Sequence, residues 1–264
     1  MYDISKFIAS KCANMADIAL LEFPKLVSRK IWTTEKSWNF HTPCYFDWFR
    51  KEAKSPKQAA GFSGQVLRNF VAAFIEYPKP LIAVLNGPAV GIGATFLPLC
   101  DAVFMSDKAT LKTPFGSTAQ APEGCSSYTF PKLLGMHAFL AKVLLQIAFQ
   151  YHFKILQLIS GPSLAKKMLM FDHTMSAEEA KACGLVTDVF PHDSFDEKVT
   201  EKINEIAMYH PNVLQRIKSI VDSHERDILH AVNEKECQNL VEVWQSEECT
   251  RGLEMLLAKI TSKW

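Results

Sequence analysis

The sequence lacks the short motifs of several common enzyme classes. It has no GxGxxG, so a dinucleotide-binding fold has little support, and no GxSxG, so a serine hydrolase is not indicated. Its eight histidines include no HExxH and form no cluster with cysteine at metal-ligand spacing. The sequence therefore predicts no metal site.

The cysteine pattern argues against a disulfide framework. The seven cysteines are odd in number, widely spread and without a CxxC pair; they are Cys12, Cys44, Cys100, Cys125, Cys183, Cys237 and Cys249. This pattern is typical of free thiols in a reducing compartment. The first residues also lack the basic region and uninterrupted apolar run of a secretory signal, so a secretory route is not expected.

No charge of one sign dominates the chain. Twenty-nine basic residues balance twenty-eight acidic ones, so the sequence predicts neither a nucleic-acid partner nor a polybasic membrane anchor. The most hydrophobic stretch, residues 136–160, is interrupted by Lys142 and Lys154, which excludes a membrane span. Because its polar residues recur every four positions, we expect an amphipathic, mostly buried helix; binding at a membrane surface is the alternative.

With 264 residues, 48% of them hydrophobic, the chain is expected to form one large globular domain. Residues 1–60 show no period that supports a helix or a strand. Further along, the pattern predicts helices at 65–75, from Gly91 to Cys100 and over most of the chain after 194, and strands at 81–85, 102–105, 110–112 and 185–190.

Serines mark three predicted helix starts. Ser176 with Glu179 and Ser194 with Glu197 each match the capping box, and Gly184 is expected to end the first of these helices. A Gly-, Pro- and Ser-rich loop after the strand at 110–112 is expected to end where Ser126 or Ser127 caps another helix.

The segment NGPAVGIGAT follows the apolar strand LIAVL and opens a helix. A glycine turn that feeds a helix N-terminus leaves unpaired N–H groups directed at whatever lies above it. The N–H of Ile92, between Gly91 and Gly93, is therefore a candidate donor to a ligand oxygen. The alternative is that the two glycines only allow the helix and the sheet to pack closely.

Glu123 is the one charged residue in the stretch from Pro114 to Phe130. A carboxylate among apolar neighbours has its charged form desolvated, so its pKa is raised and it suits a general base near neutral pH. The alternative is an ordinary solvated loop glutamate. Cys125, two residues further on, is a much weaker candidate as a nucleophile because no histidine is near it in sequence.

The stretch from Lys79 to Gly135, together with GPSLAKKMLMF, SAEEAKACGLVTDVFP and HAVNEKECQNL, resembles the crotonase (enoyl-CoA hydratase/isomerase) superfamily, most closely its delta3-delta2-enoyl-CoA isomerase 2 branch. The resemblance covers about two thirds of the chain. It implies an α/β fold, a spiral of ββα units followed by a C-terminal helical region that forms homotrimers. It also implies an acyl-CoA thioester substrate, no separate cofactor because CoA is part of the substrate, and a peroxisomal or mitochondrial location.

The resemblance also assigns roles to residues. It makes the Ile92 N–H one donor of an oxyanion hole, Glu123 the base, and Gly91, Gly93 and Pro122 substrate-binding residues. Two glutamates that hydratases use correspond here to Thr95 and Phe115. One carboxylate suffices for a 1,3-proton shift, so the resemblance favours double-bond isomerisation over hydration. The alternative function is an inactive crotonase-like module that binds acyl-CoA or proteins, as the related domains of chromodomain Y-like proteins do.

Two segments depart from the family pattern. Residues 1–60 contain no match to the family's first oxyanion motif, so this N-terminal segment is atypical and the first strands of the spiral lack a counterpart. Without those strands, an edge of the sheet is expected to be exposed. The apolar stretch 136–160 is an insertion within a crotonase-like domain predicted over 61–264.

Overall fold

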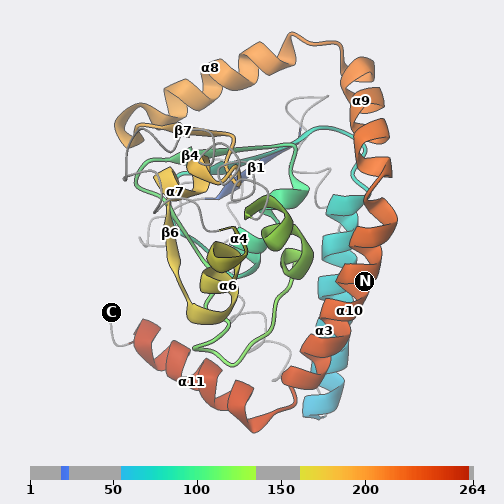
Figure 1. The fold of residues 1–264 in the computed structure, drawn as a ribbon, viewed down its shortest axis with the longest axis vertical. Helices are drawn as coiled ribbons and strands as arrows, with labels where there is room; N and C mark the ends of the chain where they lie inside the picture. Colours follow the sequence, from blue (N-terminus) through green and yellow to red (C-terminus); the bar gives the residue numbers. More distant parts are fainter. Residues whose placement is uncertain (1–18, 24–54, 135–160, 262–264) are drawn as a thin grey trace, which may run out of the picture.

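The computed structural model describes residues 19–23, 55–134 and 161–261, and Figure 1 shows two sheets surrounded by helices. The larger sheet has four parallel strands in the order β1-β2-β4-β7, and the smaller sheet has the order β3-β5-β6. In the smaller sheet β3 and β5 are parallel, whereas β5 and β6 are antiparallel. The strands are β1 (Ala19–Phe23), β2 (Leu81–Leu85), β3 (Ala89–Val90), β4 (Ala102–Ser106), β5 (Thr110–Lys112), β6 (Thr174–Ser176) and β7 (Asp188–Phe190).

Short helices lie between the strands, and the long helices form the outside of the molecule (Figure 1). Residues 126–134 are helical as well. The other helices are α3 (Pro56–Ile75), α4 (Ile92–Thr95), η1 (Leu97–Leu99), α6 (Gly161–Phe171), α7 (Ala177–Ala182), η3 (His192–Ser194), α8 (Phe195–Ala207), α9 (Pro211–Ser223), α10 (Arg226–Val243) and α11 (Glu247–Thr261).

Strand β2 is buried at all five of its positions, as its continuous apolar sequence predicts. Side chains alternate between the two faces of a strand, so β2 contributes to two cores. Leu81, Ala83 and Leu85 belong to the main core, which includes apolar residues of α3. Ile82 and Val84 belong to a second core, formed with Phe104 of β4 and Phe195, Val199 and Ile203 of α8. Helices therefore cover both faces of the larger sheet.

The N-terminal segment contributes a strand that the sequence did not predict. Strand β1 pairs with β2 in parallel, from Ala19 opposite Leu81 to Phe23 opposite Leu85. The expectation of an exposed sheet edge is therefore wrong for β2, and β1 is the outer strand of this sheet in the described residues. The sequence ALLEF of β1 is too short for a period to separate a strand from a helix, so the strand is recognisable only from its partner.

Several predicted elements have different bounds in the structure. Helix α3 begins at Pro56 and not near residue 65, because Ser55 caps it by accepting a hydrogen bond from the Gln58 N–H at 3.2 Å. The predicted helix from Gly91 to Cys100 consists of two short helices, α4 and η1, with Pro98 inside the second. The strand predicted at 185–190 is confined to β7.

One predicted capping box is confirmed and the other is wrong. At the start of α7 the Ser176 hydroxyl accepts from the Glu179 N–H at 3.2 Å, and the Glu179 carboxylate accepts from the Ser176 N–H at 2.9 Å. Gly184 follows that helix with φ 78°, as predicted. Ser194 makes no cap hydrogen bond, because it ends the 3-10 helix η3 and does not have the extended backbone that a capping serine needs.

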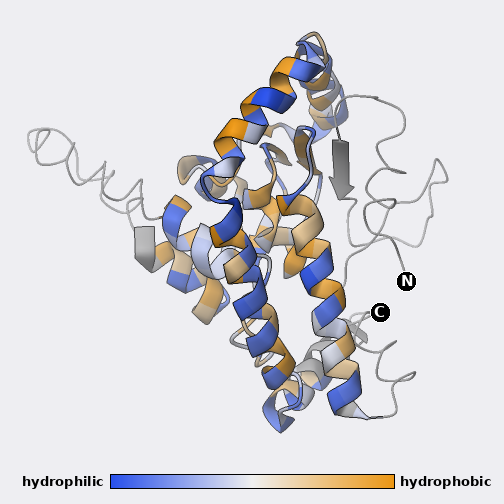
Figure 2. Cartoon of the chain, turned by 90° about the vertical axis from the view of Figure 1, so that its right-hand side faces the viewer, coloured by the Kyte–Doolittle hydropathy of each residue, from blue (hydrophilic) through white to orange (hydrophobic). Residues whose placement is uncertain are grey.

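The C-terminal region is helical, as predicted, and α10 lies along α3 (Figure 1). The Asn233 side chain donates to the Arg68 carbonyl oxygen at 2.9 Å, and Arg68 pairs with Glu234 at 2.8 Å. Hydrophilic and hydrophobic bands alternate along the long helices (Figure 2). None of the helices in the described residues is long and apolar enough to cross a membrane. The predicted helix at 136–160 lies outside these residues.

Five of the seven cysteines lie in the described residues, and all five are free thiols: Cys100, Cys125, Cys183, Cys237 and Cys249. The prediction that the chain has no disulfide framework is confirmed for these five. Cys12 and Cys44 lie outside the described residues.

Candidate active site

The glycine turn after β2 has the geometry of a donor site. Gly91 has φ 61° and ψ −127°, a conformation that residues with a side chain avoid. Its N–H donates to the Lys112 carbonyl oxygen at 2.9 Å, which fixes the turn to β5. Ile92 is the first residue of α4, where the backbone N–H has no partner inside the helix.

The structure favours one of the two explanations for Gly93. A Cβ atom built on Gly93 meets only the Cβ of Ala89, at the ordinary contact distance of 3.9 Å. Packing within the described residues therefore does not require a glycine here. The missing side chain leaves space beside the Ile92 N–H, as a ligand-binding role requires.

Glu123 is buried, with 4% of its surface exposed. The alternative of a solvated loop glutamate is therefore wrong. Burial raises the pKa of Glu123 to about 8, and the nearby Glu236 carboxylate adds to the rise. A hydrogen bond from the Ile92 backbone N–H opposes this rise. The structure thus brings together the two groups that the sequence singled out, although 31 positions separate them in the chain.

The loop that carries Glu123 packs tightly against α4. Gly124 has φ 67°, and a Cβ atom at this position would lie 2.7 Å from Thr95 Oγ1 and 3.2 Å from the Phe96 backbone nitrogen. Thr95 is fully buried and lies next to the glycine that follows Glu123. The resemblance places a glutamate of hydratases at this position, and here it holds a hydroxyl. Phe115, at the second such position, is buried.

A second buried carboxylate, which the sequence reasoning missed, holds the same loop. Glu236 of α10 accepts hydrogen bonds from the Cys125 N–H at 2.7 Å and from the Ser127 N–H at 2.8 Å. The prediction that Ser126 or Ser127 caps the helix at 126–134 is therefore wrong. A carboxylate from a distant helix satisfies these N–H groups instead.

Two other residues beside Glu123, Cys125 and Pro122, are also candidates from the sequence. Burial raises the pKa of the Cys125 thiol to about 12, and this thiol donates to the Leu229 carbonyl oxygen at 3.4 Å, so it is not an activated nucleophile. Pro122 is half-buried beside Glu123. The described residues contain no group of three His, Cys, Asp or Glu that could hold a metal ion.

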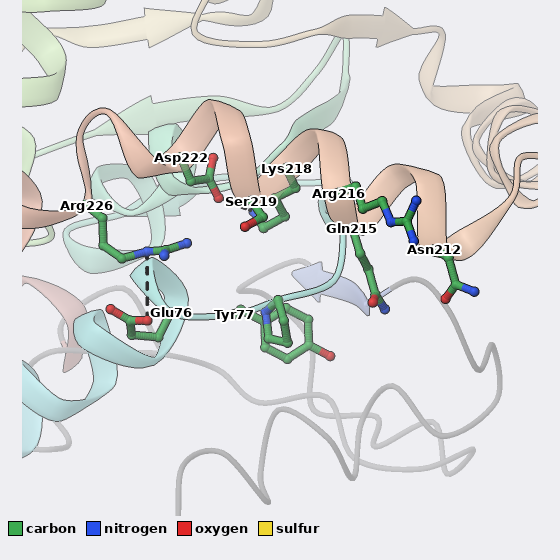
Figure 3. A pocket seen from close by; sticks show the side chains of 10 residues that line it. Glu76, Tyr77, Asn212, Gln215, Arg216, Lys218, Ser219, Asp222 and Arg226 are labelled. Atoms are coloured by element: carbon green, nitrogen blue, oxygen red, sulfur yellow. Dashed lines mark ion pairs between the residues drawn. The ribbon is translucent and has the colours of Figure 1, made fainter.

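A pocket of about 470 Å³ lies elsewhere, between the end of α3 and the helices α9 and α10 (Figure 3). Glu76 and Arg226 face each other across it, 3.8 Å apart. Tyr77 and Pro78 of this pocket precede β2, whereas the glycine turn follows β2. Five residues of extended strand, about 13 Å, separate these two edges of the sheet. This pocket is therefore distinct from the site at Glu123.

The remaining predictions about the site fall on other residues. Residues 1–60 contain no match to the family's first oxyanion motif, and 1–18 and 24–54 of this segment lie outside the described residues. The roles of Gly91, Gly93 and Pro122 in substrate binding remain predictions.

A sequence profile of the family described as "Enoyl-CoA hydratase/isomerase" matches residues 47–152 and 146–264, which together make up most of the chain. The chain belongs to this family. A solved structure of enoyl-CoA hydratase/isomerase from Pseudoalteromonas atlantica superposes with a TM-score of 0.59 at 24% identity, over 72% of this chain and 66% of the other. The structure of Pseudomonas aeruginosa OdaA superposes with a TM-score of 0.67 at 23% identity, over 96% of this chain and 85% of the other. The likeness to the enoyl-CoA hydratase/isomerase structure confirms the crotonase-like α/β fold.

Curated relatives place the chain near the enoyl-CoA delta isomerases of the enoyl-CoA hydratase/isomerase family. Human enoyl-CoA delta isomerase 2 is 43% identical over 74% of this chain and 43% of its own length. Mouse enoyl-CoA delta isomerase 3, peroxisomal, is 40% identical over 74% of this chain and 53% of its own. Human chromodomain Y-like protein 2 is 36% identical over 75% of this chain and 34% of its own. The chain thus spans about half the length of the two isomerases.

Proposed function

We propose that this protein is a delta3-delta2-enoyl-CoA isomerase that acts on unsaturated fatty acyl-CoA thioesters. The observation that carries the proposal is the buried Glu123 carboxyl facing the Ile92 N–H. In the complex, the thioester carbonyl oxygen takes the place of the carboxylate as acceptor of this N–H. Glu123 then lies beside the carbon next to that carbonyl, where the proton to be removed is located.

The reaction is a proton shift within one molecule. Ionised Glu123 removes a proton from C2 of the 3-enoyl thioester, and the electron pair forms an enolate whose oxygen accepts from the Ile92 N–H. The same carboxyl returns the proton at C4, which gives the conjugated trans-2-enoyl-CoA. No atom is gained or lost. CoA is part of the substrate, and the mechanism needs no other cofactor.

The number of available carboxylates supports isomerisation over hydration. Hydration needs a second group to position and deprotonate water, and Thr95 and Phe115 cannot replace a carboxylate in this role. Glu236 does not supply the missing group, because each of its two oxygens already accepts a backbone N–H. Among the residues that the structure describes, Glu123 is therefore the proton acceptor that the site offers to the substrate.

The test is turnover of 3-hexenoyl-CoA by the purified chain, followed by the absorbance of the conjugated thioester. We expect conversion by the unmodified protein, loss of at least a hundredfold in Glu123→Gln, and no hydration of trans-2-hexenoyl-CoA. Glu242→Gln is the matched control because it removes the same charge from an exposed position. No conversion by a folded, unmodified protein would contradict the proposal.

The second candidate is a module that binds acyl-CoA or proteins without turnover. The similarity to chromodomain Y-like protein 2 favours it. Calorimetry with hexanoyl-CoA separates the two functions, since binding without turnover of any enoyl-CoA supports the module. Turnover that depends on Glu123 excludes it.

The assembly and location of the protein form part of the same proposal. A homotrimer is supported by four apolar residues on one side of α9 that are exposed in the single chain: Val213, Ile217, Ile220 and Val221. Light scattering after size exclusion is expected to give three times the chain mass of 29.7 kDa. The proposed location is the peroxisome or the mitochondrion, and the name of the mouse relative supports the peroxisome. Imaging of the tagged protein with markers of both organelles tests this location.

A further inference from the structure

Glu236 binds the loop of the base from a distant part of the chain. Its oxygens accept the N–H groups of Cys125 and Ser127, residues that lie 111 and 109 positions away in sequence. The glutamate is buried, with 6% of its surface exposed. Hydrogen bonds from backbone N–H groups to a carboxylate are among the stronger ones in proteins, and this carboxylate makes two at once.

The backbone that Glu236 binds is strained. Cys125 has φ 63°, in the left-handed region that disfavours a residue with a side chain, and it follows Gly124, whose φ is 67°. Such a conformation persists only where the surrounding structure enforces it. Glu123 directly precedes these two residues, so the contacts that enforce this turn also set the direction of the Glu123 side chain.

Helix α10 gives Glu236 a fixed position. One turn before it, Asn233 donates to the Arg68 carbonyl oxygen of α3 at 2.9 Å. Glu234 pairs with the Arg68 side chain at 2.8 Å. These two contacts with Arg68 attach α10 to α3. The carboxylate of Glu236 is therefore a rigid support for the loop.

In the part of the chain that the structure describes, few charged groups face Glu123. From α10 the Glu236 carboxylate faces it, and α10 also carries the nearby Cys237 thiol. From α4 the Ile92 N–H faces it. Burial raises the pKa of Glu236 as well, and hydrogen bonds from the Ser127 hydroxyl and from the N–H groups of Ser127 and Cys125 oppose this rise. Because these donors stabilise a carboxylate, we place the negative charge of the pair on Glu236.

We propose that Glu236 is the positioning residue for the base: its carboxylate holds residues 125–127 so that Glu123 lies against the Ile92 N–H. The same carboxylate places a negative charge beside Glu123, and this charge disfavours ionisation of the base. The proposal deepens the proposed function and rests on it for its catalytic meaning. The two hydrogen bonds and the buried charge pair are features of the free protein, so they are testable without turnover.

The first experiment titrates the unmodified, full-length chain labelled with ¹³C-glutamate. The carboxyl signal of Glu123, assigned by its absence in Glu123→Gln, is expected to titrate near pH 8. The amide signals of Cys125 and Ser127 are expected to lie at low field over the range in which Glu236 is ionised. A Glu123 signal that titrates as an ordinary glutamate would overturn the proposal, whatever the protein catalyses.

The second experiment compares Glu236→Gln with Glu236→Asp. The glutamine removes the charge, so the pKa of Glu123 and the acid limb of kcat/KM are expected to move down by roughly one unit. At pH 9, where Glu123 is mostly ionised in both proteins, we expect kcat to fall about tenfold or more because the loop is held less firmly. The aspartate keeps the charge, so the acid limb of the kcat/KM pH profile should stay near that of the unmodified protein. Its kcat should still fall, because the shorter side chain holds the loop less firmly.

Glu242→Gln is the matched control, since it removes a carboxylate from an exposed position on the same helix. It should leave the titration of Glu123 unchanged. If Glu236→Gln loses activity but leaves that titration and the acid limb unchanged, Glu236 has only a structural role and the proposal is wrong. If the unmodified protein has no isomerase activity but its Glu123 titrates near pH 8, the proposed function fails and the charge pair stands.

Discussion

Replacing Glu123 with glutamine is expected to stabilise the protein while it removes the activity. The folded protein raises the pKa of this carboxyl from an ordinary value of 4.5 to about 8, first through burial and then through the charge of Glu236. A carboxyl with a raised pKa binds its proton more tightly in the folded state than in the unfolded state. Its contribution to stability is therefore fully present below about pH 4.5 and is lost as the pH rises through 8.

The size of the effect follows from the shift. One pKa unit corresponds to about 1.4 kcal/mol, so ionising Glu123 lowers the free energy of unfolding by roughly 3 to 5 kcal/mol between these two pH values. Glutamine carries no charge at any pH and can still accept the hydrogen bond of Ile92. The free energy of unfolding of Glu123→Gln should therefore exceed that of the unmodified protein by several kcal/mol above pH 8. Near pH 5 the two should be similar.

Urea unfolding between pH 5 and pH 9, followed by tryptophan fluorescence and circular dichroism, measures this difference. Glu242→Gln removes the same charge at an exposed position, so its stability should follow that of the unmodified protein at every pH. If Glu123→Gln also follows the unmodified protein across this range, the carboxyl does not titrate as a buried group. Glu123 would then not be a base with a raised pKa.

Three further predictions test other parts of the fold. Gly91→Ala should destabilise the protein by about 1 to 3 kcal/mol because of its positive φ, whereas Gly93→Ala should fold normally and lose at least tenfold in kcat/KM; equal stability losses in both would contradict this. Ser176→Ala should lower the free energy of unfolding by about 1 kcal/mol and Ser194→Ala by less than about 0.5 kcal/mol, as denaturant curves would show. Lys218→Met removes the cation that pairs with the partly buried Asp101 carboxylate and should lower the free energy of unfolding by about 2 to 3 kcal/mol. An unchanged thermal midpoint would refute this expectation.

The sequence was informative where a local pattern determines the structure. Five consecutive apolar residues predict β2 with both faces covered, and the glycines after it predict the turn that presents the Ile92 N–H. A single charge in an otherwise uncharged loop identifies Glu123 as unusual. These features depend on residues within a few positions of one another, so a reader of the sequence can find them.

Structure that depends on distant partners could not be read in this way. Strand β1 is defined by its pairing with β2, about sixty residues away, and not by a period of its own. The cap of the helix at 126–134 comes from Glu236, which in sequence is one of several charged residues on an amphipathic helix. Ser194 matches the capping box in sequence, but the preceding turn gives its backbone the wrong conformation.

The attachment of the Glu123 loop to α10 has a consequence for synthesis on the ribosome. The strands and the glycine turn have all emerged before residue 236 is translated, so the sheet can form while the N–H groups of Cys125 and Ser127 still lack their acceptor. The site matures only when the helix that carries Glu236 docks on α3. A nascent chain stalled before that point would already contain Ile92 and Glu123, but the loop that carries Glu123 would lack the carboxylate that binds it.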